Sequence, residues 1–562
     1  MTPLDFRNTN TLWCSVLAET LVRRGVAWAV ISPGSRSTPL TMALVQNEGI
    51  EAIPVLDERS AAFFALGLAK QTGRPVVLVC TSGTAGANYF PAVIEAQESD
   101  VPLIVITADR PPEMRDCASG QTIDQQKLFG GFVRFYHELA VPEAAVAMLG
   151  YLRQTVAHAV ERATAGGPVH LNAPLRDPLP PIADATAKGL AGEDWTAFFA
   201  HLDAKAPVVK QTVAWSTQAT RGVIVAGPGV EAEDVRTLAK ATGWPVLADV
   251  LSPVRHQAGE VVAAYDVILR NAELARELTP GVVLCLGGWP TSKVLRGWME
   301  ASGAEVWLAA DGEANRDALH GRTRVIRARA EALSVEAPAV DPAYASAWFE
   351  AERKAAKALV EGLKVETVLV EPQVTATLAA QLPEGTPLFV ANSMPVRDLE
   401  YFWPANTRGV KVFFSRGANG IDGTLSTALG VAHGNTPTVL LTGDLALLHD
   451  TNGFLSVPQL CGSLTIVLVN NAGGGIFNHL PVAQFDPPFE KYWATPQSVD
   501  FAKLCSAYGV EHVAVNDTAQ LASLIANLPA AGVRVLEVRT ERARDAAFRK
   551  KLFADVAAGL TQ

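Results

Sequence analysis

The feature that most constrains this chain is a repeated unit of a short Val, Ile and Leu run, a turn of small residues, and a helical pattern. In the first third, the apolar runs lie at residues 27–32, 75–80, 102–107 and 168–172. Runs that alternate with helices are typical of βαβ units, in which helices cover both faces of a parallel sheet. The unit recurs at residues 222–226, 281–287 and 304–310, and again at 387–391, 438–442, 464–470 and 534–539. The sequence therefore predicts an α/β fold of three doubly wound, mainly parallel sheets.

Two stretches interrupt the pattern and indicate domain boundaries. Residues 177–206 begin with Pro178, Pro180 and Pro181 and then lose strand periodicity. Residues 323–371 are rich in Ala, Glu and Arg, which favours helix and connection rather than sheet. Boundaries near residues 185 and 350 give an N-terminal α/β domain (1–185), a middle α/β domain (186–350) and a C-terminal α/β domain (351–562).

Composition excludes several classes of protein. The 562 residues are 49% hydrophobic and 19% charged, so the chain can bury a large core and is not mainly disordered. The formal charge of −10 disfavours wholesale binding of a nucleic acid backbone. The six cysteines are scattered, no export signal is visible and no apolar run spans a membrane. We expect a cytoplasmic protein without a membrane span.

The strongest local signal lies in the C-terminal third. One predicted strand ends in Gly443-Asp444, and the next ends in Asn470-Asn471-Ala472-Gly473-Gly474-Gly475. The interval between Asp444 and Asn471 fits one βαβ crossover, which places both at the carboxyl ends of parallel strands, where ligands bind in open sheets. A carboxylate, an amide oxygen and the carbonyl of Gly473 are oxygen ligands of the kind that Mg²⁺ takes together with phosphate oxygens. Taken together, the two halves predict a metal–diphosphate site.

Taken alone, each half has a plainer interpretation. Gly443-Asp444 could be a helix cap and the glycine run a turn. The sequence has no G-x-x-x-x-G-K-[ST] motif, which disfavours a P-loop NTPase. Gly227-Pro228-Gly229 is too short for a dinucleotide fingerprint.

A second signal is Asp57-Glu58-Arg59, between a predicted strand at 52–56 and a predicted helix at 59–71. Acidic residues are favoured in a first helical turn by capping and by the helix dipole, which would explain them fully. A glutamate partly desolvated between two sheets would instead have a raised pKa suited to sharing a proton. The sequence leaves both interpretations open.

A third signal is a set of arginines and hydroxyls at predicted strand ends. The turn Ser32-Pro33-Gly34-Ser35-Arg36-Ser37-Thr38-Pro39-Leu40 can hold an anion through its hydroxyls and Arg36. Arg110, Arg397 and Arg416 follow other strands. A lone surface arginine is usually a solvated charge, but several at the ends of different strands favour a substrate with more than one carboxylate.

Together these residues resemble the thiamine-diphosphate-dependent enzymes, whose metal–diphosphate motif opens with Gly-Asp and closes with Asn. The resemblance extends from about Thr11 to Phe485. Within the family, the chain is most similar to the carboligases of menaquinone biosynthesis, and the Ser32–Leu40 turn is its most specific motif. Ala108-Asp109-Arg110-Pro111 and the stretch from Ser415 to Gly423 add to it.

The resemblance implies a role for each matching residue. Asp444, Asn471 and the Gly473 carbonyl would hold Mg²⁺ (or Mn²⁺), and Glu58 would bond the aminopyrimidine ring of thiamine diphosphate. The other implied cofactor contacts are Ser393, Ile421, Gly443 and Ile476. The implied substrate shell is Ser35, Arg36, Arg110, Gln121, Lys293, Arg397 and Arg416 on its polar side, with Ile476, Phe477 and Leu480 on its apolar side. Glu58, Arg36 and Arg397 are the predicted catalytic residues.

The implied activity is a transferase reaction that decarboxylates 2-oxoglutarate and adds the four-carbon unit to isochorismate. The family also implies a homodimer or a dimer of dimers, in which the glutamate of one chain serves the diphosphate site of the other. One position departs from some relatives, because Lys293 is followed by Val294 rather than by Arg.

Two alternatives remain at this point. Another enzyme of the same cofactor class, such as an acetohydroxyacid-synthase-like or 2-oxoacid-decarboxylase-like protein, would share the Gly-Asp and Asn signals. A non-catalytic α/β nucleotide-binding protein would share the sheets, but it gives no reason for Glu58, Asp444 and Asn471 to occur in one chain.

Overall fold

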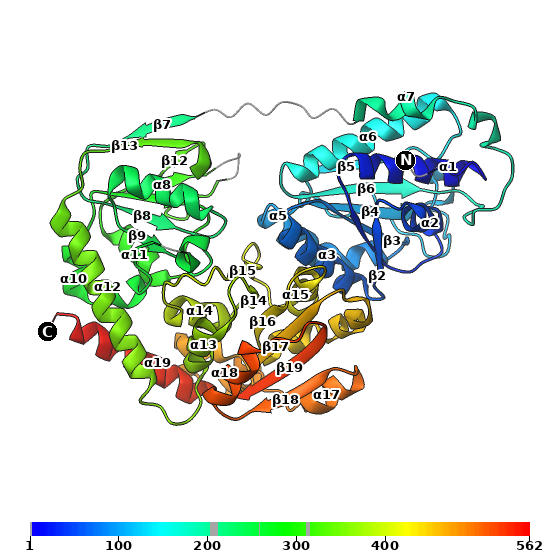
Figure 1. The fold of residues 1–562 in the computed structure, drawn as a ribbon. Helices are drawn as coiled ribbons and strands as arrows, with labels where there is room; N and C mark the ends of the chain where they lie inside the picture. Colours follow the sequence, from blue (N-terminus) through cyan, green and yellow to red (C-terminus); the bar gives the residue numbers. More distant parts are fainter. Residues whose placement is uncertain (1–2, 203–211, 258, 311–314, 562) are drawn as a thin grey trace.

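The computed structural model describes residues 3–202, 212–257, 259–310 and 315–561, and Figure 1 shows them as three α/β lobes. The N-terminal lobe runs from blue to cyan, the middle lobe is green, and the C-terminal lobe runs from yellow to red. Each lobe has its own parallel sheet, of six, five and six strands. The predicted fold class is confirmed.

The N-terminal sheet has the strand order β2-β1-β3-β4-β6-β5, and all its neighbours pair in parallel. β3 and β4 are buried along their whole length, as expected for strands covered on both faces. The strands are β1 (Trp28–Ile31), β2 (Glu51–Pro54), β3 (Val76–Cys80), β4 (Leu103–Asp109), β5 (Phe135–Glu138) and β6 (Pro168–Pro174). The helices are α1 (Thr9–Arg23), α2 (Thr38–Gln46), α3 (Glu58–Thr72), α4 (Ala85–Asn88), α5 (Phe90–Glu98), α6 (Val146–Thr164) and α7 (Trp195–Phe199).

The middle sheet has the order β12-β11-β10-β8-β9, with a separate pair β13-β7 beside it. The strands are β7 (Val213–Ser216), β8 (Gly222–Ala226), β9 (Val246–Ala248), β10 (Val282–Leu286), β11 (Glu305–Ala309), β12 (Thr323–Ile326) and β13 (Leu333–Glu336). The helices are α8 (Ala232–Thr242), α9 (Tyr265–Ile268), α10 (Ala272–Glu277), α11 (Lys293–Ala301) and α12 (Pro342–Leu363).

One secondary-structure prediction was wrong. Residues 323–371 were expected to be helix and connection, and α12 does lie there, but β12 and β13 also fall inside this stretch. Both are four-residue strands with two exposed residues and only one buried residue each, one at the edge of its sheet and one in a two-stranded pair. Such strands bury too little surface to leave a clear apolar run in the sequence.

The C-terminal sheet has the order β15-β14-β16-β17-β19-β18, again all parallel. Its central strands β16 and β17 are buried almost throughout. The strands are β14 (Pro387–Val390), β15 (Lys411–Phe414), β16 (Thr438–Gly443), β17 (Ser463–Asn470), β18 (Glu511–Val515) and β19 (Gly532–Arg539). The helices are α13 (Glu371–Gln381), α14 (Met394–Phe402), α15 (Thr424–Ala432), α16 (Asp444–His449), α17 (Phe501–Ala507), α18 (Thr518–Ala526) and α19 (Arg542–Gly559).

The N-terminal and C-terminal lobes pack through α3 and α15, which cross at two glycines. A Cβ on Gly67 would lie 1.9 Å from the Thr427 carbonyl oxygen, and one on Gly430 would lie 2.0 Å from that of Phe64. The helices therefore touch backbone to backbone at this crossing. On the other side, α12 and α19 contact each other and join the middle lobe to the C-terminal one (Figure 1).

The domain boundaries near residues 185 and 350 stay predictions. Trp195 and Phe199 pack in the N-terminal hydrophobic core, and α12 runs continuously through residue 350.

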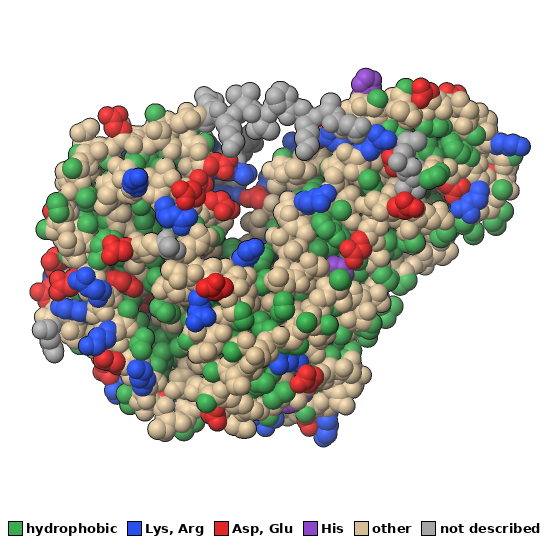
Figure 2. All heavy atoms as spheres, viewed as in Figure 1, with side chains coloured by type: hydrophobic (Ala, Val, Ile, Leu, Met, Phe, Trp, Pro, Cys, Tyr) green, Lys and Arg blue, Asp and Glu red, His purple; other side chains and the backbone are tan. Residues whose placement is uncertain are grey.

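The surface gives little indication of a macromolecular ligand. On the face drawn in Figure 2, acidic and basic side chains are interspersed rather than gathered into a basic stripe. Among the described helices, none is both long enough and apolar enough to cross a membrane.

Candidate active site

Asp444 lies where the central strand β16 meets helix α16, and its side chain is buried. Its Oδ1 accepts the backbone N–H of Leu445, and its Oδ2 accepts that of Gly473, both at 2.8 Å. Burial raises the pKa of this carboxyl to about 6. The second of these bonds ties the end of β16 to the glycine turn after β17.

Asn471 follows β17, the strand next to β16, and is also buried. Its Nδ2 donates to Oε1 of Glu371, whereas its Oδ1 is buried without a hydrogen-bond partner among the described residues. A buried carbonyl oxygen without a partner costs free energy unless a ligand or a water satisfies it. Beside it, Gly473 has φ +141°, and a Cβ there would lie 2.4 Å from the carbonyl oxygen of Ala494, so this position requires glycine.

These residues line a cavity of about 450 Å³ at the carboxyl edge of the C-terminal sheet. Ser393 enters it from the start of α14 with φ +70° and ψ −130°, a conformation that non-glycine residues rarely adopt outside functional sites. The cavity also brings together most of the other residues predicted for this lobe, namely Arg397, Arg416, Ile421, Gly443, Ile476 and Phe477.

Two arginines place positive charge in this cavity. Nη1 of Arg416 donates to Oδ1 of Asn392 at 3.0 Å, and Nη1 of Arg397 donates to the Ser393 carbonyl at 2.5 Å. Burial lowers the pKa of both guanidinium groups, and the charge of Arg397 lowers that of Arg416 further. The two cations are close enough to repel each other, and a bound carboxylate would relieve that repulsion.

A larger cavity of about 1200 Å³ adjoins the first between the middle lobe and α19. Arg397 and Ile476 line both cavities, whereas Lys293, at the start of α11, and Leu480 line only the larger one. Lys293 is exposed, and Val294 beside it also lines this cavity. The middle lobe therefore contributes Lys293 to this cavity, together with Arg270, which forms an ion pair with Asp266.

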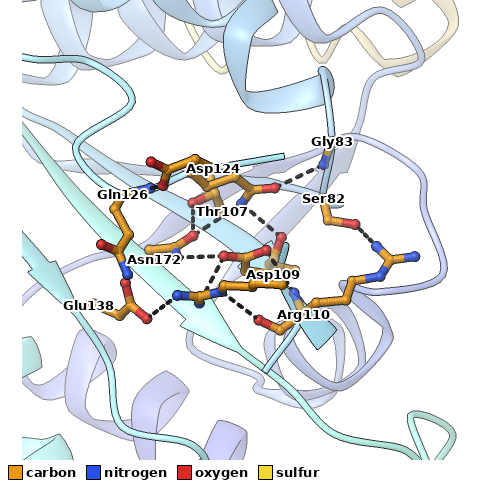
Figure 3. Close-up of polar contacts among 12 residues, drawn as sticks. Ser82, Gly83, Thr107, Asp109, Arg110, Asp124, Gln126, Glu138 and Asn172 are labelled. Carbon is orange, nitrogen blue, oxygen red and sulfur yellow. Dashed lines mark hydrogen bonds and ion pairs between the residues drawn. The ribbon is translucent and has the colours of Figure 1, made fainter. Parts of the chain in front are cut away.

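Arg110 belongs to a second polar cluster, at the carboxyl ends of strands in the N-terminal lobe. Its Nη1 donates to Oγ of Ser82 and, at 3.0 Å, to the carbonyl of Gln121, while Nε2 of Gln121 donates to the Ser82 carbonyl at 3.0 Å. Behind Arg110, the buried carboxylate of Asp109 accepts from Nδ2 of Asn172 at 2.8 Å (Figure 3). This network fixes the backbone from which Arg110 and Gln121 extend.

Arg36 lies in the same cluster. Its Nη1 donates to the Leu175 carbonyl at 3.0 Å, and its charge contributes, after burial, to lowering the pKa of Arg110. A Cβ on Gly34 would lie 2.2 Å from the Cβ of Thr81, so the turn that carries Ser35 and Arg36 rests directly on the end of β3. Nε of Arg36 and Nε of Arg110 are both buried without a partner among the described residues, which leaves two donors for an anion.

Glu58 is the first residue of α3 and is half-buried. Asp57 caps the helix by accepting the backbone N–H of Ser60 at 3.1 Å, so the capping interpretation holds for Asp57. Glu58 lies near the buried Tyr89, whose pKa is raised mainly by burial and also by the neighbouring Cys80 and the negative charge of Glu58. Neither of the two cavities described above is lined by Glu58.

The chain matches family models along most of its length. Residues 14–128 match the thiamine pyrophosphate enzyme N-terminal TPP-binding domain, residues 193–390 the middle domain, and residues 398–538 the C-terminal TPP-binding domain. Relatives named 2-succinyl-5-enolpyruvyl-6-hydroxy-3-cyclohexene-1-carboxylate synthase include one from Nostoc sp., 49% identical over 579 residues, which cover 99% of both chains. One from Synechococcus elongatus is 48% identical over 571 residues, which cover 99% of this chain and 98% of the relative.

The chain belongs to this synthase family, within the thiamine-diphosphate-dependent enzymes. Family membership excludes the alternative of a non-catalytic nucleotide-binding protein, and it confirms the resemblance inferred from the sequence motifs. The chain carries the two thiamine-diphosphate-binding domains of the family. Residue roles and the metal stay proposals.

The donor set at Asp444 and Asn471 fits a divalent metal ion bound together with a diphosphate group. One carboxylate, one buried amide oxygen without a partner and a glycine carbonyl offer three oxygens next to a turn of glycines. Among the described residues, no group of three or more His, Cys, Asp and Glu side chains could hold a metal. A set with a single carboxylate therefore depends on phosphate oxygens to complete the coordination.

Two acidic residues that line the smaller cavity were missed from the sequence. Glu371 and Asp398 both line the smaller cavity, and both are buried against Arg549 of α19. Glu371 follows a helix and a connection rather than a strand, so no strand-end signal marks it. Asp398 stands next to Arg397, but a single acid within a helical pattern is indistinguishable from a surface residue.

Proposed function

We propose that this chain forms 2-succinyl-5-enolpyruvyl-6-hydroxy-3-cyclohexene-1-carboxylate and CO₂ from 2-oxoglutarate and isochorismate, with thiamine diphosphate and Mg²⁺ or Mn²⁺ as cofactors. This proposal rests on one observation. Asp444 and Asn471, whose Oδ1 has no hydrogen-bond partner among the described residues, line the same cavity as two arginines. One part of that cavity fits a metal–diphosphate group, and the other fits a carboxylate substrate.

The metal ligands in this proposal are Asp444, Asn471 and the carbonyl of Gly473. Gly443 and the glycine turn let the diphosphate approach the backbone, and Ile421 and Ile476 offer apolar contacts to the rings. Ser393, in its strained conformation, is a further cofactor contact. When bound, thiamine diphosphate supplies the chemistry that breaks the bond to the leaving carboxylate and forms the new carbon–carbon bond.

The substrate carboxylates are held by the cations of the two clusters. Arg397 and Arg416 lie beside the diphosphate site and Lys293 at its mouth, so they can orient 2-oxoglutarate and one end of isochorismate. Arg36 and Arg110, with Ser35 and Gln121, offer a second anion site. Phe477 and Leu480 form the apolar wall that keeps water from the reacting carbons. Val294 leaves Lys293 as the single cation at its position.

Glu58 and the cavity are separate within one chain, and this supports a homodimer, possibly a dimer of dimers. In this arrangement Glu58, Ser35, Arg36, Arg110 and Gln121 of one chain complete the cavity of the other, so that each dimer has two composite sites. Glu58 would bond the aminopyrimidine ring and hold a proton there. We also infer that the enzyme is cytoplasmic, since the cysteines at its six positions are all free thiols.

The test is a four-component assay. The purified protein is incubated with thiamine diphosphate, Mg²⁺, 2-oxoglutarate and isochorismate, and isochorismate loss is followed by absorbance while the product is identified by mass. Loss that requires all four components supports the proposal. CO₂ release from pyruvate with isochorismate untouched would instead assign the chain to an acetohydroxyacid-synthase-like or decarboxylase-like activity.

A further inference from the structure

We propose that Glu371 is a positioning residue of the metal site, which fixes the side-chain amide of Asn471 so that Oδ1 faces the cation. This inference rests on the proposed function, because it takes Asn471 as a metal ligand. It adds a residue that is not among the proposed ligands of the metal, the cofactor or the substrate, and that determines which end of the amide faces the metal.

The argument starts from the hydrogen-bonding capacity of the two groups. A carboxylate only accepts hydrogen bonds, whereas an amide can donate from nitrogen and accept at oxygen. Asn471 places Nδ2 against Oε1 of Glu371, so its Oδ1 must point the other way, toward the cavity. The reversed amide would bring two acceptor oxygens together in a buried place. Glu371 therefore selects one of the two amide orientations.

The space around Asn471 reinforces this selection. A Cβ on Gly475 would lie 2.7 Å from Nδ2 of Asn471, so the amide is confined from that side as well. Both Asn471 and Glu371 are buried, at 8% and 3% exposure, so solvent does not compete strongly for the Nδ2 donor. Partners behind a metal ligand commonly fix its orientation in this way.

Glu371 is itself held from three helices. It is the first residue of α13, and its Oε2 accepts from Nη2 of Arg549 on α19. Arg549 in turn donates from Nε to Oδ1 of Asp398 on α14 at 2.7 Å. A buried arginine between two carboxylates leaves Glu371 little freedom to move, so the orientation of Asn471 is set by the packing of α13, α14 and α19.

The test uses a donor–acceptor swap. In Glu371→Gln, the new amide must give its oxygen to Arg549, because its NH₂ would repel the guanidinium. That NH₂ then faces position 471 and favours an acceptor there, which turns Oδ1 of Asn471 away from the cation. In the double variant Glu371→Gln/Asn471→Asp, the new carboxylate accepts from the new amide with one oxygen and keeps the other for the metal. The swap also conserves net charge.

The readout is Mn²⁺ affinity in the presence of thiamine diphosphate, followed by the electron paramagnetic resonance signal of free Mn²⁺. We expect Glu371→Gln to weaken Mn²⁺ binding about 10- to 100-fold in the protein that keeps Asn471. In the protein that carries Asn471→Asp, the same change should cause no weakening. The charge lost at position 371 is the same in both backgrounds, so the difference between them isolates orientation. Glu352→Gln removes another glutamate that accepts backbone N–H groups, at Ala263 and Ala264, and should leave Mn²⁺ binding unchanged.

Equal weakening in both backgrounds, or no weakening in either, would overturn the positioning role while leaving the metal site intact. If the unaltered protein with thiamine diphosphate binds no Mn²⁺, the proposed function fails and the positioning role fails with it. Melting temperatures without cofactor report folding. If Glu371→Gln does not fold, Glu371→Asp replaces it, because the shorter side chain withdraws the acceptor oxygen without removing the charge. We expect Glu371→Asp to weaken Mn²⁺ binding only in the protein that keeps Asn471.

Discussion

The carboxylate of Glu95, on α5 of the N-terminal lobe, accepts the backbone N–H of Ala418 in the C-terminal lobe at 2.7 Å. Its other oxygen accepts the N–H of Gly417 at 3.1 Å, and Lys70 lies 3.6 Å from the same carboxylate. Glu95 is 3% exposed. The loop that it holds, between β15 and α15 (Figure 1), also carries Arg416 and Ile421, so the N-terminal lobe helps to position two residues that line the smaller cavity of the C-terminal lobe.

Glu95→Gln should loosen this loop. The new amide can accept only one of the two backbone N–H groups, and losing one hydrogen bond to a charged acceptor costs about 1.5 kcal/mol. Since Arg416 contacts a substrate carboxylate in our proposal, we expect KM to rise about 10-fold with little change in kcat. Steady-state kinetics for both substrates would measure the effect. Glu98→Gln, on the exposed side of the same helix, is the control and should leave KM unchanged.

Glu58→Gln should abolish most of the activity. The variant keeps the size of the side chain, but an amide cannot exchange the proton that Glu58 would share with the aminopyrimidine ring in our proposal. A positioned acid–base group contributes at least ~100-fold, so kcat should fall by at least that factor. Thiamine diphosphate binding, measured by fluorescence quenching, should change less than kcat. Near-normal turnover would exclude Glu58 from proton transfer.

Two inactive variants should restore activity when their chains are mixed. In our homodimer, Glu58 and Asp444 of one site come from different chains, so a dimer of Glu58→Gln with Asp444→Ala has one damaged and one intact site. Random association makes half the dimers mixed, which gives about a quarter of the wild-type activity. The two proteins are co-expressed with different tags and purified together. If mixed dimers form but have no activity, Glu58 and Asp444 of one chain act in the same active site.

The two strand-end signals were predictable because strand ends leave a clear pattern. Asp444 and Asn471 each follow a buried apolar run, and βαβ geometry alone brings adjacent strand ends together. The arginines at strand ends were predictable for the same reason, and Arg397 and Arg416 do share a cavity.

Glu95 and Glu371 could not be predicted in that way. Glu95 lies within a regular helix, where an acidic residue is indistinguishable from a solvated one, and its partners are more than 300 positions away. Glu371 begins a helix, where an acid is expected for capping alone. Both contacts depend on how whole lobes and helices pack, which no local pattern encodes.

The free energy of unfolding should fall in acid because of a buried histidine in the N-terminal lobe. His170 is buried and bonds Oγ1 of Thr107 through Nε2 at 2.7 Å, and burial lowers its pKa from 6.5 to about 3. The unfolded chain binds a proton at this residue below pH 6.5, whereas the folded chain does not until about pH 3. The stability that neutral His170 contributes is therefore present above pH 6.5 and lost as the pH falls, by about 2 kcal/mol at pH 5.

Melting temperatures at pH 7 and pH 5 would measure this loss. We expect His170→Gln to lose less stability between the two pH values than the unaltered protein does. His158→Gln is the control, because the His158 side chain is 44% exposed. An identical pH response in the His170→Gln variant would assign the acid sensitivity to other groups.

The crossing of α3 and α15 should tolerate no side chain larger than hydrogen at Gly67. A methyl group there would lie 1.9 Å from the backbone oxygen of Thr427, which cannot move without displacing α15. We expect Gly67→Ala to lower the free energy of unfolding by at least ~2 kcal/mol, as overpacking against backbone does. Gly150→Ala is the matched control, since Gly150 is also helical but has no atom within 4 Å of the added Cβ. That change should raise the free energy of unfolding by about 0.5–1 kcal/mol through helix propensity alone. Urea unfolding of both variants measures the contrast, and equal stabilisation of the two would mean that the lobes do not meet at Gly67.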